Sequence, residues 1–140
     1  KKTSESKKEK TKRGEDLMRK LDIIEVADND INEVSGGQLQ RACICRSMIN
    51  KPKVLFADEP TGALNRTASN EVMKELVKLN EEGTTIMMVT HDAKVAAKCS
   101  KVLYIVDGNI KGEYISPKEL EIEEKDRERL LNNWLMELGW

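Results

Sequence analysis

Several features that would assign the protein to a broad class are missing from its sequence. No apolar run approaches the roughly 18 residues that a membrane-spanning helix needs, and no secretory signal is visible. Aromatic residues make up only 4% of the chain, and none lies among the lysines near its start, which disfavours nucleic-acid binding. The net charge is -1, so no overall field attracts nucleic acid or an anionic membrane. We therefore expect a soluble protein that binds no nucleic acid.

Cysteine is also scarce. The three cysteines lack the spacing of a metal site with a second cluster of His or Cys. Cys43 and Cys45 lie two residues apart in a predicted helix, where their side chains point in different directions. We expect reduced thiols, as in a cytosolic protein. The first residue is Lys rather than Met, and we expect the chain to be a fragment of a longer protein.

Apolar residues, in contrast, follow a regular pattern. Three uninterrupted apolar runs have the length of strands, at residues 54–57, 85–89 and 102–106. Such runs are typical of parallel strands that are covered on both faces. Helices are predicted between them, at residues 67–82 and 92–99. This alternation is typical of an α/β fold, and the "DGN" after the third run predicts a hairpin with residues 110–115.

Further helices are predicted on both sides of this region. Leu17, Leu21 and Ile24 predict a short amphipathic helix from about Gly14, and the lysine-rich residues before it are compatible with a solvated helix or a disordered lead-in. A second helix is predicted from Ser35 to about Asn50. The final helix is predicted from a capping box with proline at its first position, Ser116-Pro117-Lys118-Glu119. We expect it to pack on its own lobe; its alternative is to anchor a partner through Trp134 and Trp140.

Chemically active side chains follow two of the predicted strands. Asp58 and Glu59 come after the first run, and His91 comes after the second. Ligands of open parallel sheets bind beyond the carboxyl ends of the strands. There an Asp can hold Mg²⁺, a Glu can deprotonate water and an imidazole can donate to a phosphate oxygen. Each feature also has an alternative that involves no ligand. Asp58 and Glu59 are then ordinary acidic residues of a turn before Pro60, and His91 is a loop residue before Asp92, which caps a helix.

Two glycines open the helix that begins near Ser35. Ser35 and Gln38 form the sequence pattern of a capping box, which needs no ligand. That pattern does not explain Gly36 and Gly37, because glycine costs about 1 kcal/mol relative to alanine within a helix. Bare amides at a helix start suit an approaching phosphate, so the pattern favours an anion site.

Four segments resemble, in order, the motifs of ATP-binding-cassette (ABC) ATPases. They are "VSGGQLQR" (34–41) for the signature sequence, "VLFADEP" (54–60) for the Walker B strand, "TGALN" (61–65) for the D-loop and "VTHD" (89–92) for the switch-histidine loop. The spacings, 23 residues from Ser35 to Asp58 and 33 from Asp58 to His91, fit the family without insertion. The wording "DEPTGAL" is closest to the exporters of lipoproteins, macrolides and bacitracin-like peptides.

The resemblance implies a fold and a set of roles. The fold is an incomplete α/β, parallel-sheet P-loop NTPase-like core with three parts: a helical-subdomain remnant (1–50), the core (51–116) and a C-terminal helix (117–140). The implied nucleotide contacts are the signature residues, which would reach the γ-phosphate of an ATP held by a partner subunit: Ser35, Gly36, Gly37 and Gln38. Asp58 would serve Mg²⁺, Glu59 would be the general base and His91 would sense the γ-phosphate.

The resemblance also implies partners. Ala63 and Asn65 would cross an interface with a second ABC subunit, in a homodimer; the family usually has Asp where Asn65 stands, and Asn keeps the shape but loses the charge. A transmembrane permease would hold the cytoplasmic subunit at the inner face of the membrane. No phosphate-binding loop of the form G-x-x-x-x-G-K-[ST] occurs, so we expect no ATPase activity from this chain alone. The alternatives are an ABC-type ATPase of DNA repair or chromosome maintenance, disfavoured by the lack of sustained heptads, and a non-catalytic lobe that only binds a partner.

Overall fold

A computed structural model describes residues 6–117 and 122–140. Along the chain the elements are α1 (Lys7–Lys20), two short 3₁₀ helices (Ile24–Val26 and Ile31–Glu33), α2 (Gly36–Met48), β1 (Val54–Asp58), α3 (Arg66–Glu81), β2 (Thr85–Val89), α4 (Ala93–Ala96), β3 (Lys101–Val106), β4 (Asn109–Ile115) and α5 (Glu124–Glu137). They form two compact units, Lys1–Val89 and Thr90–Trp140.

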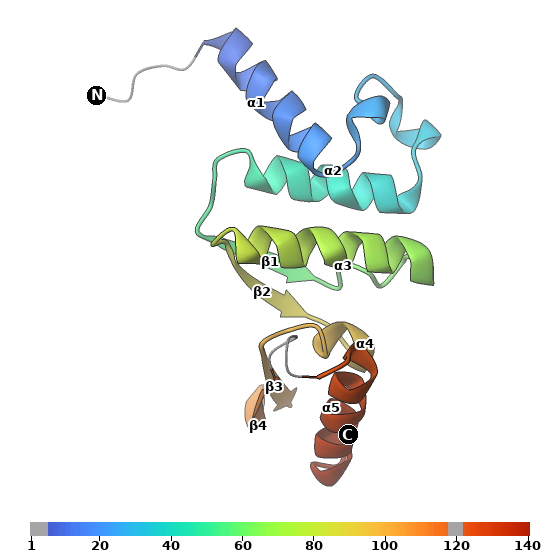
Figure 1. Cartoon of the computed structure of the whole chain (residues 1–140), viewed down its shortest axis with the longest axis vertical. Helices are drawn as coiled ribbons and strands as arrows, with labels where there is room; N and C mark the ends of the chain where they lie inside the picture. The colour runs from blue at the N-terminus through green and yellow to red at the C-terminus, as the bar shows by residue number, and fades with distance from the viewer. Residues whose placement is uncertain (1–5, 118–121) are drawn as a thin grey trace, which may run out of the picture. The chain divides into compact units, whose positions relative to one another are not determined.

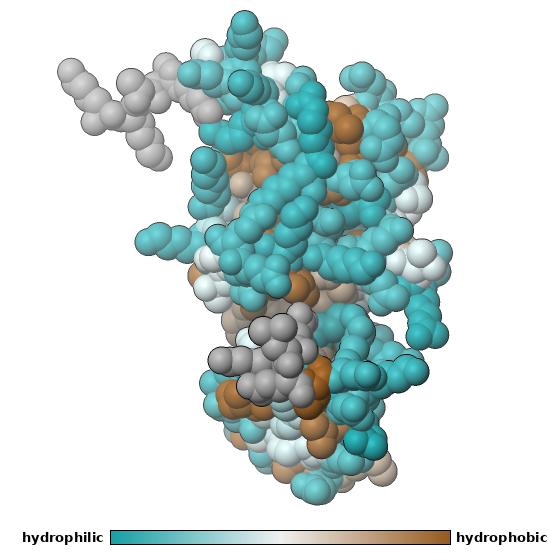
Figure 2. Space-filling model, in the orientation of Figure 1, coloured by the Kyte–Doolittle hydropathy of each residue, from teal (hydrophilic) through white to brown (hydrophobic). Residues whose placement is uncertain are grey.

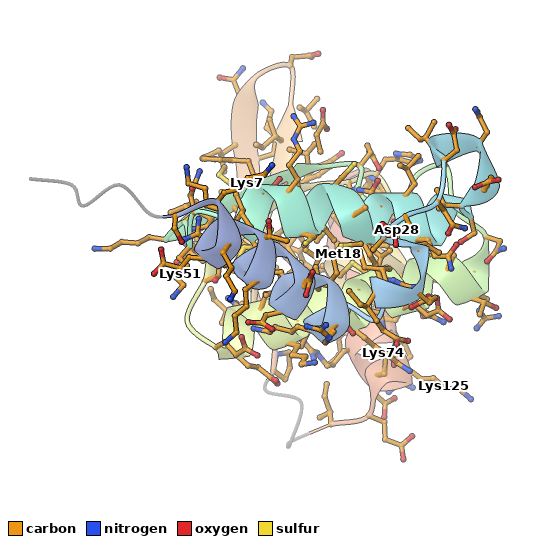
Figure 3. The ribbon with its side chains drawn as sticks, turned by 90° about the horizontal axis from the view of Figure 1, so that it is seen from above. Lys7, Met18, Asp28, Lys51, Lys74 and Lys125 are labelled. Carbon is orange, nitrogen blue, oxygen red and sulfur yellow. The ribbon has the colours of Figure 1, made fainter. Side chains whose placement is uncertain are left out.

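The first unit is a stack of helices on a small sheet. Helix α1 lies across α2, and α2 lies beside α3, which in turn covers one face of β1 and β2 (Figure 1). Figure 3 shows the crossing of α1 over α2 from above, with Met18 labelled there. The side chains that are fully buried in this stack are Leu21, Ile23, Val72, Leu76 and Leu79. Polar side chains cover most of the face of this helical part that Figure 2 shows.

Helix α1 begins earlier than its apolar pattern predicts. Ser6 Oγ accepts from Glu9 N (3.3 Å), and Glu9 Oε2 accepts from Ser6 N (2.7 Å). This capping box starts the helix at Lys7 rather than near Gly14. The backbone N–H of Ser6, which donates to the Glu9 carboxylate, and to a smaller extent the Ser6 hydroxyl hold the pKa of Glu9 below its usual value. Residues 7–13 are therefore a solvated helix and not a disordered lead-in.

The parallel sheet contains two of the three predicted strands. β1 and β2 are parallel, with Phe56 opposite Met87, which confirms the expected chain direction. The prediction for residues 102–106 is confirmed in its partner and wrong in its sheet: this segment, β3, pairs antiparallel with β4 in the predicted hairpin and lies outside the parallel sheet. The prediction that both faces of the sheet are covered is also wrong, because α3 packs on one face and the large apolar residues of the other are exposed.

The second unit is a hairpin packed on a helix. Asp107 (φ 50°) and Gly108 (φ 73°) form the tight turn between β3 and β4, as "DGN" predicts. Tyr114 of the hairpin packs on Trp134 of α5 with ring centroids 5.4 Å apart. Helix α5 therefore packs on its own lobe, as expected. The helix begins at Glu124, and the predicted capping box at residues 116–119 extends outside the described residues.

Gly112 of β4 lies close to side chains of α5 and of Leu138, which follows that helix. A Cβ atom on Gly112 would lie 2.6 Å from Leu138 Cδ1 and 2.7 Å from Trp134 Cζ2. Gly112→Ala should therefore lower the free energy of unfolding by about 1–3 kcal/mol, because the crowded side chains must move. Chemical unfolding followed by tryptophan fluorescence measures this. On a Leu138→Ala background the loss should shrink, and an undiminished loss there would contradict the packing described.

Candidate functional site

The acidic turn after β1 has an unusual backbone. Glu59 has a φ of 44°, in the left-handed region that favours glycine. Holding a non-glycine residue there costs on the order of 1–3 kcal/mol, and such residues concentrate at functional sites. Glu59 N donates to Val89 O at 2.9 Å, which ties the turn to the end of β2. The turn begins directly after Asp58, the last residue of the strand.

The loop after Glu59 folds back against it. Gly62 N donates to Glu59 O at 3.1 Å, and a Cβ atom on Gly62 would lie 3.7 Å from Glu59 Oε2. Pro60 and Thr61 are buried, whereas Asp58 is exposed and Glu59 is half-buried. The loop therefore positions the Glu59 carboxylate at the surface, where it has access to water.

Asn65 has a structural role that the sequence analysis missed. It is the N-cap of α3, and its Oδ1 accepts from Ala68 N at 2.9 Å. An aspartate oxygen would accept the same hydrogen bond. The replacement of the family's usual Asp by Asn65 therefore preserves the start of α3, and the preceding Ala63 is exposed.

The predicted capping box at the start of α2 is present. Ser35 Oγ accepts from Gln38 N (3.2 Å), and Gln38 Oε1 accepts from Ser35 N (2.9 Å). Gln38 Nε2 also lies 3.5 Å from Glu25 Oε1. Ser35 and Gly36 are exposed, but Gly37 is buried. An anion at this helix start would meet Ser35 and Gly36 first.

The structure places the start of the signature segment, at the beginning of α2, next to the D-loop. A Cβ atom on Gly36 would lie 3.2 Å from Leu64 Cδ2, and one on Gly37 would lie 3.0 Å from Ala68 Cβ. Close packing of α2 on α3 thus accounts for Gly37 without an anion, an explanation that the sequence analysis did not consider. No sequence signal identified this contact, because it joins two helices that β1 separates in the chain.

Gly37→Val should therefore destabilise the first unit. The added methyl groups would push α2 from α3, and overpacking of this kind costs typically 1–3 kcal/mol. The matched control is Gly14→Val in α1, where a Cβ atom would meet nothing within 4 Å, and which should change stability by less than about 0.5 kcal/mol. Urea unfolding of both variants, followed by circular dichroism, measures the difference. Equal effects would refute a packing role for Gly37.

Arg41 fixes the signature helix to its neighbours. Its guanidinium is buried, with Nη1 2.8 Å from Glu71 Oε2 on α3 and Nη2 3.5 Å from Asp22 O after α1. Arg41 is the last residue of the "VSGGQLQR" segment, and its sequence position alone did not indicate this role. The arginine connects α2 to α3 and to the segment that follows α1.

His91 belongs to the second unit, so its approach to Glu59 stays a prediction. Asp92 caps α4: its Oδ1 accepts from Lys94 N at 2.8 Å, and its own N–H donates to Thr90 Oγ1 at 3.1 Å. The capping interpretation of Asp92 is therefore confirmed. His91 itself is exposed. It lines an open hollow of about 370 Å³ whose other walls are Asp92, Ala93, Lys94, Glu128, Asn132 and Trp140.

One side chain of the candidate site, that of Asp58, could bind a magnesium ion. Among the described residues, no three His, Cys, Asp or Glu side chains cluster as a metal site. Asp58 is exposed at its strand end, which fits Mg²⁺, since this ion commonly takes one or two carboxylates and completes its shell with water and phosphate oxygens. Within the same residues, no helix has the length and apolarity to cross a bilayer.

Comparisons with known proteins point to the same family that the sequence motifs resemble. A family model described as "ABC transporter" matches residues 1–62. The bacitracin export ATP-binding protein BceA of Halalkalibacterium halodurans is 48% identical over 91 residues, which are 64% of this chain and 36% of BceA. The macrolide export ATP-binding/permease protein MacB of Bartonella henselae is 43% identical over 105 residues, 75% of this chain and 16% of MacB.

A solved structure shows the same fold. The ATP-binding cassette MJ0796, as a dimer in a post-hydrolysis state with ADP and Pi, matches with a TM-score of 0.70 and 34% identity, over 82% of this chain and 50% of that one. The described units therefore have the α/β fold of an ABC ATPase cassette, of which the chain spans about half. The chain belongs to the family of ABC transporter ATP-binding proteins, and its relatives include exporters of antibiotics.

Proposed function

We propose that this chain is part of an ABC subunit in which ATP is hydrolysed between two protomers. It supplies the signature start, which is Ser35 and Gly36 at the beginning of α2, and the hydrolytic turn, which is the turn at Glu59. One observation supports the proposal above others: the exposed Gly36, which follows the exposed Ser35, lies so close to the D-loop residue Leu64 that a Cβ atom on it would be 3.2 Å from Leu64 Cδ2. A second protomer that approached the D-loop would therefore also meet the signature start. Only a short loop separates Leu64 from Glu59, which has the strained backbone. The loop therefore joins the surface around Ser35, Gly36 and Leu64 to the turn at Glu59.

The proposed chemistry uses few groups of this chain. Glu59 takes a proton from the attacking water, as a half-buried carboxylate at the surface can do. The Ser35 hydroxyl and the Gly36 amide donate to the γ-phosphate of an ATP held by the other protomer. Asp58 would hold Mg²⁺, which neutralises phosphate charge when it is bound. His91 would donate to the same γ-phosphate.

The proposed partners follow from the family. A second copy of the subunit completes each ATP site, with Ala63 and Asn65 at the interface, and a transmembrane permease uses the energy to export a peptide, lipid-linked or antibiotic substrate. The subunit would then lie in the cytoplasm, at the inner face of the membrane. The relatives named for macrolide and bacitracin export support the substrate class.

The test measures ATP turnover of the full-length subunit without its permease, at increasing protein concentration. Because each site needs two protomers, turnover per protomer should rise with concentration and level off when dimers predominate. Sedimentation in ATP should show the dimer over the same range. Turnover per protomer that is independent of concentration, in a subunit that stays monomeric with ATP, would contradict the proposal.

A further inference from the structure

The first seven residues of α1 are strongly basic. Residues 7–13 contain four lysines and one arginine against one glutamate, a net charge of +4, although the net charge of the whole chain is -1. The four lysines are all exposed. They are Lys7, Lys8, Lys10 and Lys12, and we call them the lysine cluster. Among the described residues, no side chain forms an ion pair with any of the four.

The second half of α1 lacks this excess of unpaired charge. Arg19 Nη2 lies 3.4 Å from Glu15 Oε2, and Arg19 Nη1 lies 3.3 Å from Asp16 Oδ1. Lys20 pairs with Glu82, the residue that ends α3. Its basic side chains are therefore matched by acids of the same unit, whereas those of the lysine cluster are not.

The lysine cluster also lies on the part of α1 that projects from the helical stack. The carbonyl oxygen of Gly14 lies 4.0 Å from Cys45 Sγ of α2. Before Gly14, the helix rises away from α2 (Figure 1). The lysines are therefore accessible to a large partner.

The lysine cluster does not stabilise the helix that carries it. The amides at a helix N-terminus carry partial positive charge, so acidic side chains are favoured in the first turn and lysines are disfavoured. Lys8 and Lys12 lie four residues apart, where like charges repel. Ser6 and Glu9 already cap this helix start. The lysines thus weaken the helix in the chain alone, and an external anion would offset the repulsion.

The distribution of the charge indicates a flat anionic partner. At 3.6 residues per turn, the four side chains fan out over roughly 200° of the helix, which suits a surface better than a groove. Residues 7–13 include no aromatic residue to stack on bases and no apolar residue to enter the core of a protein interface. Lysine is a mobile point charge, whereas bidentate recognition of one carboxylate or phosphate favours arginine. Clusters of four or more basic residues on a helix are typical of binding to anionic lipid headgroups.

We infer that the lysine cluster binds anionic lipid headgroups directly, as a contact between the subunit and the bilayer that is separate from the permease. The choice of a membrane over other polyanions rests on the proposed function, which holds the subunit at the inner face of the membrane. Each lysine near an anionic surface contributes a factor of about five in affinity. Four lysines therefore give a reversible contact that supplements attachment through the permease.

The experiment measures co-sedimentation of the full-length subunit with lipid vesicles, without its permease and without ATP. One set of vesicles is phosphatidylcholine alone, and the other contains an equal part of phosphatidylglycerol. The subunit should bind the anionic vesicles and not the neutral ones, and binding should weaken as salt is added, because salt screens exposed charges. Replacement of the whole lysine cluster by glutamine should lower the partition coefficient at least about 10-fold.

A second variant with the same change in net charge is the matched control. It replaces by glutamine four exposed lysines of other elements, Lys74, Lys78, Lys111 and Lys125. This control should bind the anionic vesicles as the parent does. Both variants should keep the circular dichroism of the parent, since all the replaced residues are exposed and such substitutions change stability little.

Three results would overturn the inference. The first is a parent subunit that does not bind the anionic vesicles, and the second is a cluster variant that binds them as well as the control variant does. The third is tighter binding of the parent to a short single-stranded RNA than to the vesicles at the same salt concentration, because the partner of the lysines would then be a nucleic acid.

Vesicle binding is measured without ATP, so its outcome is separate from that of the proposed function. Vesicle binding through the lysine cluster by a subunit that is inactive as an ATPase would leave the membrane contact standing and refute the hydrolysis. Concentration-dependent ATP turnover by a subunit that ignores anionic vesicles would refute only the membrane contact.

Discussion

Glu59→Gln is expected to abolish ATP turnover in the full-length protein while ATP-induced dimers persist. The amide keeps the size and the hydrogen-bonding shape of the carboxylate, but it cannot take a proton from water. General-base catalysis contributes roughly 10²–10⁴-fold to a rate, so turnover should fall by at least about 100-fold. Binding needs no base, so the dimer should form as before and dissociate more slowly, because its ATP is not consumed.

The measurement combines phosphate release with sedimentation in ATP. Glu81→Gln, an equivalent change at an exposed residue near the end of α3, is the matched control and should keep the parent rate. A Glu59→Gln protein that hydrolyses ATP near the parent rate would show that another group is the base. A variant that lost both turnover and dimers would indicate that the left-handed turn had collapsed.

Ser35→Arg is expected to weaken ATP-dependent dimerisation of the full-length protein by about 10-fold or more. Ser35 is exposed at the start of α2, where a long side chain would fill the space that the γ-phosphate of the facing protomer needs. The change also removes a helix cap, which by itself costs about 0.5–2 kcal/mol of stability. Sedimentation in ATP measures the dimer, and thermal unfolding measures the lost cap.

The chain contains its own control for the lost cap. Helix α1 begins with an equivalent capping box at Ser6 and Glu9, in a position with no proposed contact to ATP. Ser6→Arg should therefore cost a similar amount of helix stability and leave dimerisation unchanged. If both arginine variants dimerise as the parent does, the anion site at Ser35 is refuted.

Local signals were enough to predict where α2 and α3 lie. Ser35 and Gln38 form the expected capping box, and α3 begins and ends within one residue of its predicted range. Cap chemistry depends on residues three positions apart, so it is visible in the sequence. The start of α1 shows the same rule: the Ser6 and Glu9 pattern was present, and the apolar spacing near Gly14 was the poorer guide.

Contacts between distant segments were not predictable in the same way. An apolar run is the same in a parallel and an antiparallel strand, so residues 102–106 predict a strand of the parallel sheet, whereas β3 pairs antiparallel with β4 outside that sheet. The packing of Gly37 on Ala68 and the left-handed φ of Glu59 both depend on neighbours that the sequence does not place. Single residues therefore identified the candidate site, while its geometry came from tertiary structure.

The composite ATP site is tested most directly with linked full-length heterodimers. One heterodimer carries Glu59→Gln in one protomer and Ser35→Arg in the other; a second carries both substitutions in the same protomer. The account predicts that each ATP site combines Glu59 of one protomer with Ser35 of the other. The first heterodimer then has one unaltered site and should hydrolyse ATP. In the second heterodimer each site has one altered residue, so it should be inactive. Turnover that is confined to the second heterodimer, or equal in both, would contradict the account.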